Sequence, residues 1–182
     1  MTTTRTAPTK KATKTKFNIG VVSAITESGN SALLCAAMEA MCALGFGVEV
    51  LAEGDVSAQD LCFKCAENFP QQFSMLESLS GNHEKILKKA DVIVFPARPE
   101  KKELEAVLEA GVIPVLPEGC GLANFDAQKE TGSAFTFEED NIWSLVAALV
   151  RASENRKFSW DWKMIQQNLS EAYYKDFLSK KK

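Results

Sequence analysis

The feature that most constrains the fold is a regular alternation of short apolar segments with longer helical segments. A short apolar, β-branched run bounded by polar turns is typical of a strand buried on both faces. The expected strands are 17–23, 48–51, 72–76, 91–96, 112–116 and 133–137. The expected helices are 31–44, 57–68, 83–90, 100–110, 141–152 and 162–178. This alternation predicts one α/β domain, a doubly wound parallel sheet of about six strands with helices on both faces.

Charge is distributed unevenly along the 182 residues. Residues 1–16 hold five basic side chains and no acidic one, whereas the rest of the chain holds 16 basic and 24 acidic groups. Because the first segment has few bulky apolar residues, we expect a disordered basic tail over 1–16 and the folded domain over 17–179. The tail is interpreted as solubilising, with an electrostatic tether or a targeting peptide as alternatives. The acidic body argues against nucleic acid as the main partner.

The chain lacks an apolar run of the roughly 20 residues that cross a bilayer, and no secretory signal is recognisable, so we expect a cytoplasmic protein without a membrane partner. Its odd number of cysteines, five, favours reduced thiols. Cys62 and Cys65 form a CxxC pair, for which zinc binding and redox activity are alternatives to inert packing. Packing is favoured, because the pair lies away from the helix start and the chain has one histidine. No metal or other cofactor is expected.

The loop at 23–30 follows the first expected strand and leads into a helix. Backbone N–H groups at such a helix start favour a phosphate, and ligands of parallel sheets bind outside the carboxyl ends of the strands. The loop matches neither the dinucleotide-binding glycine fingerprint nor a Walker loop. A second interpretation is therefore a solvated turn in which Ser28 or Asn30 caps the helix.

Seven landmarks follow one another in a specific order. They are VVSAITESGNSALL, VEVLAEGD, ADVIVFPARPE, GVIPV, EGCGLANF, ETGSAF and KFSW. In this order and spacing the chain closely resembles the C-terminal, donor-binding domain of bacterial glycogen and starch synthases, retaining glucosyltransferases of the two-domain GT-B fold. The resemblance covers residues 17–160. It implies a Rossmann-like sheet whose strand ends hold ADP-glucose or UDP-glucose, with the acceptor glucan bound largely by an N-terminal domain.

The resemblance implies a donor site made of three segments. The first lies after the first strand and comprises Ser23, Ala24, Thr26, Ser28, Gly29 and Asn30. The second begins at Glu100, in the position of a catalytic-site glutamate beside the glucose, and continues into Lys101 and Lys102. The third replaces a Thr-Gly-Gly-Leu loop and comprises Gly119, Cys120, Gly121 and Leu122.

Several departures from the family pattern bear on catalysis. Ala24 and Gly29 stand where the family has an arginine and a lysine that contact the donor's phosphates. Losing one such preorganised group typically costs about 3–4 kcal/mol, on the order of 10²–10³ in rate. A Lys-Lys-Glu sequence at 101–103 replaces Pro-Cys-Gly. Its lysines either replace the missing cations or are solvated surface residues, and Glu100 has a helix-dipole role as its alternative.

Aromatic residues near the C-terminus suggest packing or a partner surface. Phe158 and Trp160 match a Phe-Ser-Trp that precedes the last helix in the family, and we interpret them as packed side chains. An exposed apolar patch on the face that meets the N-terminal domain in the family would indicate a partner protein or a homodimer. Trp160, Trp162, Tyr173 and Tyr174 are candidates for that surface, with core packing as the alternative.

Three functions remain open on the sequence. The first is a stand-alone, degenerate glycosyltransferase domain that is not an enzyme on its own and serves as a nucleotide or nucleotide-sugar binding or regulatory module. The second is an active glucosyltransferase half completed by a separate acceptor-binding domain. The third is a protein-interaction domain without a small ligand. The loss of both first-loop cations favours the first and the third.

Overall fold

A computed structural model describes residues 16–24, 26, 30–79 and 81–175. The tail expected at 1–16, apart from Lys16, and the end of the last expected helix, beyond 175, lie outside these residues. The strands are β1 Asn18–Val21, β2 Gly47–Ala52, β3 Phe73–Glu77, β4 Val92–Val94, β5 Ile113–Pro117 and β6 Phe135–Phe137. The helices are α1 Ser31–Ala43, α2 Val56–Asn68, α3 Asn82–Lys89, α4 Lys101–Glu109, α5 Ile142–Asn155 and α6 Ser159–Tyr173.

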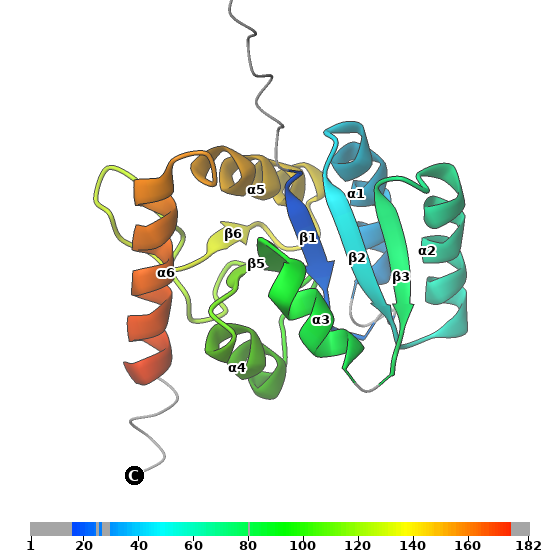
Figure 1. The fold of residues 1–182 in the computed structure, drawn as a ribbon, viewed down its shortest axis with the longest axis horizontal. Helices are drawn as coiled ribbons and strands as arrows, with labels where there is room; N and C mark the ends of the chain where they lie inside the picture. Colours follow the sequence, from blue (N-terminus) through cyan, green and yellow to red (C-terminus); the bar gives the residue numbers. More distant parts are fainter. Residues whose placement is uncertain (1–15, 25, 27–29, 80, 176–182) are drawn as a thin grey trace, which may run out of the picture.

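All strands pair in parallel in one sheet, in the order β3-β2-β1-β4-β5-β6 (Figure 1). The chain builds outward from β1 to β3 and then crosses back to β4 on the other side of β1. The point between β1 and β4 is therefore a topological switch point, outside which doubly wound sheets bind their ligands. The predicted fold class is confirmed.

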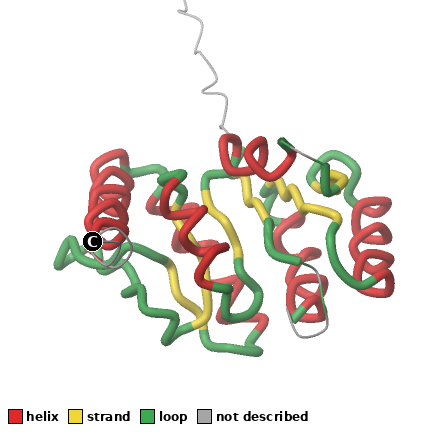
Figure 2. The backbone as a smooth tube through the Cα atoms, turned by 90° about the horizontal axis from the view of Figure 1, so that it is seen from below, coloured by secondary structure: helices red, strands yellow, loops and turns green. Residues whose placement is uncertain are grey.

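Helices cover both faces of the sheet (Figure 2). Apolar side chains of α1, α2 and α5 form one core cluster with one set of strand residues, and those of α3 and α4 form a second cluster with the alternate strand residues. Helix α6 contributes Trp162 and Ile165 to the first cluster and Leu169 to the second. This is the alternation expected of strands that are buried on both faces. Phe95, Phe135 and Phe137 are among the largest fully buried side chains.

Gly20 in β1 lets α3 approach the sheet closely. A Cβ atom at this position would lie 2.5 Å from Ile86 Cγ2 of α3 and 2.6 Å from Ile93 Cδ1 of β4. Since neither distance leaves room for a methyl group, the glycine sets how tightly the crossover helix packs over the switch point.

The start of α6 differs from the expectation. The sequence predicted a helix from Trp162, which is the first core residue of this segment and is 8% exposed. The structure begins the helix at Ser159, so that one more turn precedes the buried indole. Hydrophobic periodicity marks the buried face of a helix and misses an exposed first turn.

The aromatic packing expected at the same place is wrong in part. Phe158 and Trp160 are 61% and 65% exposed, and Trp160 Nε1 donates to Glu130 Oε1 over 3.2 Å. Trp162 provides the packing instead, and the Arg156 guanidinium lies 5.5 Å from its ring centroid. Tyr174, at the other end of α6, is exposed.

None of the helices in the described part of the chain has the length and apolar character needed to cross a membrane.

Candidate functional site at the carboxyl edge of the sheet

The three segments expected to form the donor site follow three adjacent strands. The first loop leaves β1, the segment with Glu100 leaves β4, and the loop with Gly119 leaves β5. Because β1, β4 and β5 are neighbours and parallel, their carboxyl ends lie at the same edge. Of the expected site residues, Ser28 and Gly29 lie outside the described part of the chain.

Asn30 organises the start of α1. It adopts a left-handed conformation with φ 57°, and its Oδ1 accepts from the Leu33 N–H over 3.4 Å. Its Nδ2 donates to Asp140 Oδ1 of the loop after β6 over 2.6 Å. The Ser31 N–H donates to Thr26 O over 3.2 Å. The asparagine is therefore the helix cap that the turn interpretation expected, and it also ties the first loop to the loop after β6.

These contacts change what the α1 terminus offers to an anion. Two of its N–H groups already have protein acceptors, and the carboxylate of Asp140 is held beside them through Asn30. Glu138 and Glu139 precede Asp140, and all three are exposed. A helix N-terminus favours negative charge, and here the protein supplies some of that charge itself. A phosphate at this position would be repelled by these carboxylates.

Arg98 is a cation at this edge that the sequence analysis missed. It lies in the loop after β4, and its Nη1 donates to Gly119 O over 3.2 Å, which links the β4 and β5 loops. Among the described residues it forms no salt bridge, and its side chain is exposed. Its position between the end of an apolar strand and the next helix is the sequence signal that could have indicated it.

Glu100 is the N-cap residue of α4, with an extended backbone at φ −65° and ψ 150°. Its N–H donates to Glu103 Oε2 over 2.9 Å. Lys101 and Lys102 are the first two residues of the helix and are exposed. Cations at this end oppose the helix dipole, so helix stability does not account for the two lysines.

The loop after β5 contains the expected glycines in left-handed conformations, with φ 79° at Gly119 and 91° at Gly121. Burial raises the pKa of the half-buried Cys120 thiol, while the positive charge of Arg98 lowers it and the negative charge of Glu139 raises it. Leu122 packs against the α3, α4 and α6 side of the core.

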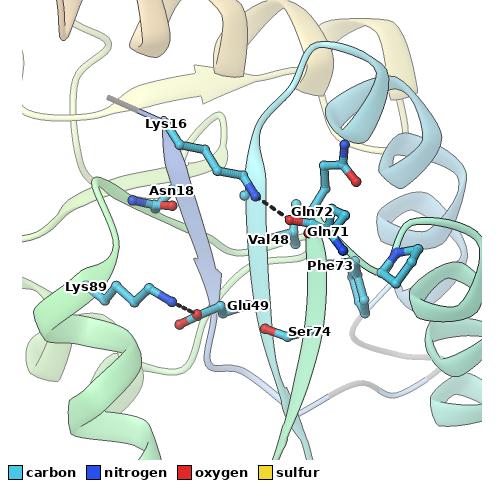
Figure 3. Close-up of a pocket in the computed structure, with 11 residues that line it drawn as sticks. Lys16, Asn18, Val48, Glu49, Gln71, Gln72, Phe73, Ser74 and Lys89 are labelled. Carbon is cyan, nitrogen blue, oxygen red and sulfur yellow. Dashed lines mark hydrogen bonds and ion pairs between the residues drawn. The ribbon is translucent and has the colours of Figure 1, made fainter. Parts of the chain in front are cut away.

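A polar cavity of about 160 Å³ lies at the opposite, amino edge of the sheet (Figure 3). It is lined by residues at the starts of β1, β2 and β3 together with Lys16 and Lys89. Lys16 Nζ donates to Gln71 O over 2.7 Å, and Lys89 pairs with Glu49. Ligand pockets usually span roughly 300–1,000 Å³, so this cavity is too small for a nucleotide sugar.

Cys62 of the CxxC sequence contacts a cysteine of another helix. Cys62 is buried in α2, and its Sγ lies 3.6 Å from Cys35 Sγ of α1. The sequence gives no sign of this contact, because the two cysteines are 27 positions apart and lie on different helices. The described residues contain no group of three or more histidine, cysteine or acidic side chains that could hold a metal ion.

Several apolar side chains are exposed where strands end at the carboxyl edge. Val56 follows β2, Leu79 follows β3, and Trp143 follows β6 at the start of α5. Trp143 is 78% exposed, and the other two are also largely exposed.

This strand order, with loops at the switch point, defines a Rossmann-like α/β domain. No family model matches the chain. The sequence is 27% identical over 158 residues to a glycogen synthase of Francisella tularensis subsp. novicida, covering 81% of this chain and 32% of that protein.

Solved structures of glycosyltransferases share this fold. The C-terminal domain of the glycosyl transferase group 1 family protein LpcC from Francisella tularensis superposes with a TM-score of 0.64, at 12% identity, covering 88% of this chain and 86% of that one. The Anabaena protein HepE in complex with UDP superposes with a TM-score of 0.67, at 12% identity, covering 89% of this chain and 45% of that one. The chain is thus a glycosyltransferase-like domain with the Rossmann-like fold of the GT-B C-terminal half, and it spans about a third of the glycogen synthase it matches.

Proposed function

We propose that this domain binds a nucleoside diphosphate or a nucleoside diphosphate sugar, such as ADP-glucose or UDP-glucose, at the carboxyl edge, and that it does not complete a glycosyl transfer by itself. It would act as a binding or regulatory module in a reducing compartment such as the cytoplasm. The observation that carries the proposal is the convergence of the β1, β4 and β5 loops at the switch point. The UDP complex of HepE, which shares the fold, supports a nucleotide as the ligand.

The charge for such a ligand would come from the β4 side of the site. Ala24 offers no cation in the first loop, and the carboxylate of Asp140 lies beside the α1 terminus. Arg98 links the β4 and β5 loops through Nη1, and its Nη2 and Nε form no hydrogen bond with the described residues. Lys102 lies at the start of α4. Arginine binds phosphate oxygens through paired N–H groups, so Arg98 is the residue proposed to contact the diphosphate.

The same charges argue against independent catalysis. A leaving diphosphate must be stabilised by preorganised positive charge. Here a hydrogen bond from Asn30 to Asp140 holds the acidic loop next to the first loop, where negative charge would oppose the leaving group. The exposed position of Arg98 weakens its field further, because water screens an exposed charge. Glu100, proposed to lie near the sugar, is already engaged in the cap of α4.

The test is an NMR shift titration of the full chain with ADP, UDP, ADP-glucose and UDP-glucose. Saturable shifts at Arg98 and Gly119–Leu122 are expected. Arg98→Ala should weaken binding about tenfold, because a hydrogen bond to a charged group contributes roughly 1.5–3 kcal/mol. Lys163→Ala is the control, since this exposed lysine lies in the second turn of α6, next to Trp162 and near the amino edge.

A variant without the Asp140 charge tests whether this carboxylate weakens nucleotide binding. Asp140→Asn should strengthen nucleotide binding, because it removes a negative charge beside the α1 terminus while keeping a partner for Asn30. Absence of saturable shifts at millimolar ligand in both the parent and Asp140→Asn would refute nucleotide binding. Transfer of glucose to a glucan by the chain alone would refute the non-catalytic part.

The exposed apolar side chains at the carboxyl edge favour one alternative, an acceptor-binding partner that covers this edge and completes a transferase. Val56 and Leu79 follow the neighbouring strands β2 and β3, and Trp143 follows β6 at the other end of the sheet. Exposed apolar surface is typical of interaction sites. A homodimer would use the same surface. Sedimentation of the parent and of Trp143→Ser separates the cases, since a homodimer would dissociate in the variant.

A further inference from the structure

Two cysteines from neighbouring helices form a close pair. Cys35 lies in the second turn of α1, and Cys62 lies in the middle of α2. Their Sγ atoms are 3.6 Å apart and share a hydrogen bond. Cys62 is 0% exposed, whereas Cys35 is half-buried. A small reagent from solvent would therefore meet Cys35 first.

The pair is close enough to become covalent with a small adjustment. A disulfide needs an S–S distance of about 2.05 Å, so the two Sγ atoms must approach by roughly 1.5 Å. The hydrogen bond from Cys62 also lowers the pKa of the Cys35 thiol, against the opposing effect of its partial burial. The thiolate is the nucleophilic form of cysteine.

We propose that Cys35 and Cys62 are a peroxide-oxidised dithiol, in which Cys35 is the attacking thiol and Cys62 resolves the intermediate into a disulfide. The Cys35 thiolate attacks one oxygen of hydrogen peroxide, an S–O bond forms, the O–O bond breaks, and the departing hydroxide takes a proton to become water. The Cys62 sulfur then attacks the sulfenic sulfur, the S–O bond breaks, and a second water leaves. One peroxide and two thiols thus give one disulfide and two waters.

The cross-link would join α1 to α2 at the level of the second turn of α1. Because α1 begins directly after the first loop, oxidation would restrain the helix on which that loop is built. Disulfides in reducing compartments are usually transient and serve redox sensing. The proposal is independent of nucleotide binding, since its readout is chemical and thermal.

The experiment uses the full chain carrying Cys65→Ser, which removes the competing thiol three residues after Cys62 while keeping the proposed pair. Cys65→Ala replaces it if the serine variant does not keep the parent's thermal midpoint. The protein is treated with hydrogen peroxide, quenched by alkylation, digested without reduction, and mapped by mass spectrometry. The matched control carries Cys35→Ser in the same background.

The expected result is a peptide pair linked through Cys35 and Cys62, with the chain about 2 Da lighter. The thermal midpoint should rise by roughly 5–10 °C and fall back on reduction with dithiothreitol, because the bond closes a long loop in the unfolded chain. The control should show neither change. Thiols that stay reduced at peroxide levels that oxidise a free cysteine, or oxidation of Cys35 only to the sulfinic acid, would overturn the proposal.

Discussion

Replacement of Gly132, which lies between β5 and β6, by alanine should lower the free energy of unfolding more than an ordinary glycine-to-alanine substitution does. Gly132 adopts φ 92°, and a Cβ atom there would lie 2.2 Å from the Asn124 carbonyl oxygen and 2.7 Å from Phe125 Cα. These are backbone atoms, so no side-chain rotation relieves the overlap. Gly132 O also accepts from Asn168 Nδ2 of α6 over 3.0 Å, so a shifted backbone would lose this contact.

The magnitude follows from a matched control. Gly111 also has a positive φ, 70°, but a Cβ atom there would meet nothing within 4 Å. Gly111→Ala therefore measures the conformational cost alone, about 1–2 kcal/mol. Gly132→Ala adds an overpacking cost of about 1–3 kcal/mol and the lost bond to α6 at about 1 kcal/mol. We expect a total of about 3–6 kcal/mol.

The assay is equilibrium unfolding in urea, followed by far-ultraviolet circular dichroism. With a denaturant slope of about 2 kcal/mol per molar, Gly111→Ala should lower the midpoint by about 0.5–1 M and Gly132→Ala by about 1.5–3 M. The reasoning is refuted if the two variants have the same midpoint, since the close approach to Asn124 would then carry no free energy.

Three further outcomes are expected. Gly20→Ala should destabilise the fold by about 1–3 kcal/mol in thermal unfolding, and adding Ile93→Val should recover part of the loss, because it removes the Ile93 Cδ1 atom that the new methyl group would meet. Asn30→Ala should lower the free energy of unfolding by about 1–2 kcal/mol and Asn30→Gly by less, because glycine tolerates the left-handed cap; equal losses would contradict the backbone argument. In iodoacetamide labelling followed by mass spectrometry, Cys120 should begin to react at a higher pH than Cys35, since a raised pKa keeps the Cys120 thiol neutral and a lowered one ionises Cys35 earlier; the reverse order would contradict the assigned causes.

The arrangement of helices and strands was predictable because it depends on local pattern. Apolar β-branched runs such as Val92–Val94 are typical of buried strands in a chain with this alternation, and each strand overlaps an expected segment. The first turn of α6 was not predictable in this way, because Trp160 is exposed and leaves no periodic signal. The exposure of Phe158 was missed for the related reason that aromatic character alone does not indicate which side of a helix start a residue faces.

The candidate site was predictable only as a set of loops. The strand pattern places the segments after β1, β4 and β5 at one edge, but it does not say which side chains meet there. The bond from Asn30 to Asp140 joins residues 110 positions apart, and the bond from Arg98 to Gly119 joins two loops across neighbouring strands. Neither pair has a signature in the sequence, since both depend on how the loops fold back over the strand ends.

By itself the sequence determined the parallel α/β fold, the edge at which the loops converge, and the absence of a cation at Ala24. These follow from residue type and local periodicity, which act over a few positions along the chain. Tertiary structure decided which charges face the site, because α1 receives the carboxylate of Asp140 and the β5 loop receives the guanidinium of Arg98. It also brought Cys35 to Cys62, since helices that pack on the same face of a sheet place side chains from distant positions in direct contact.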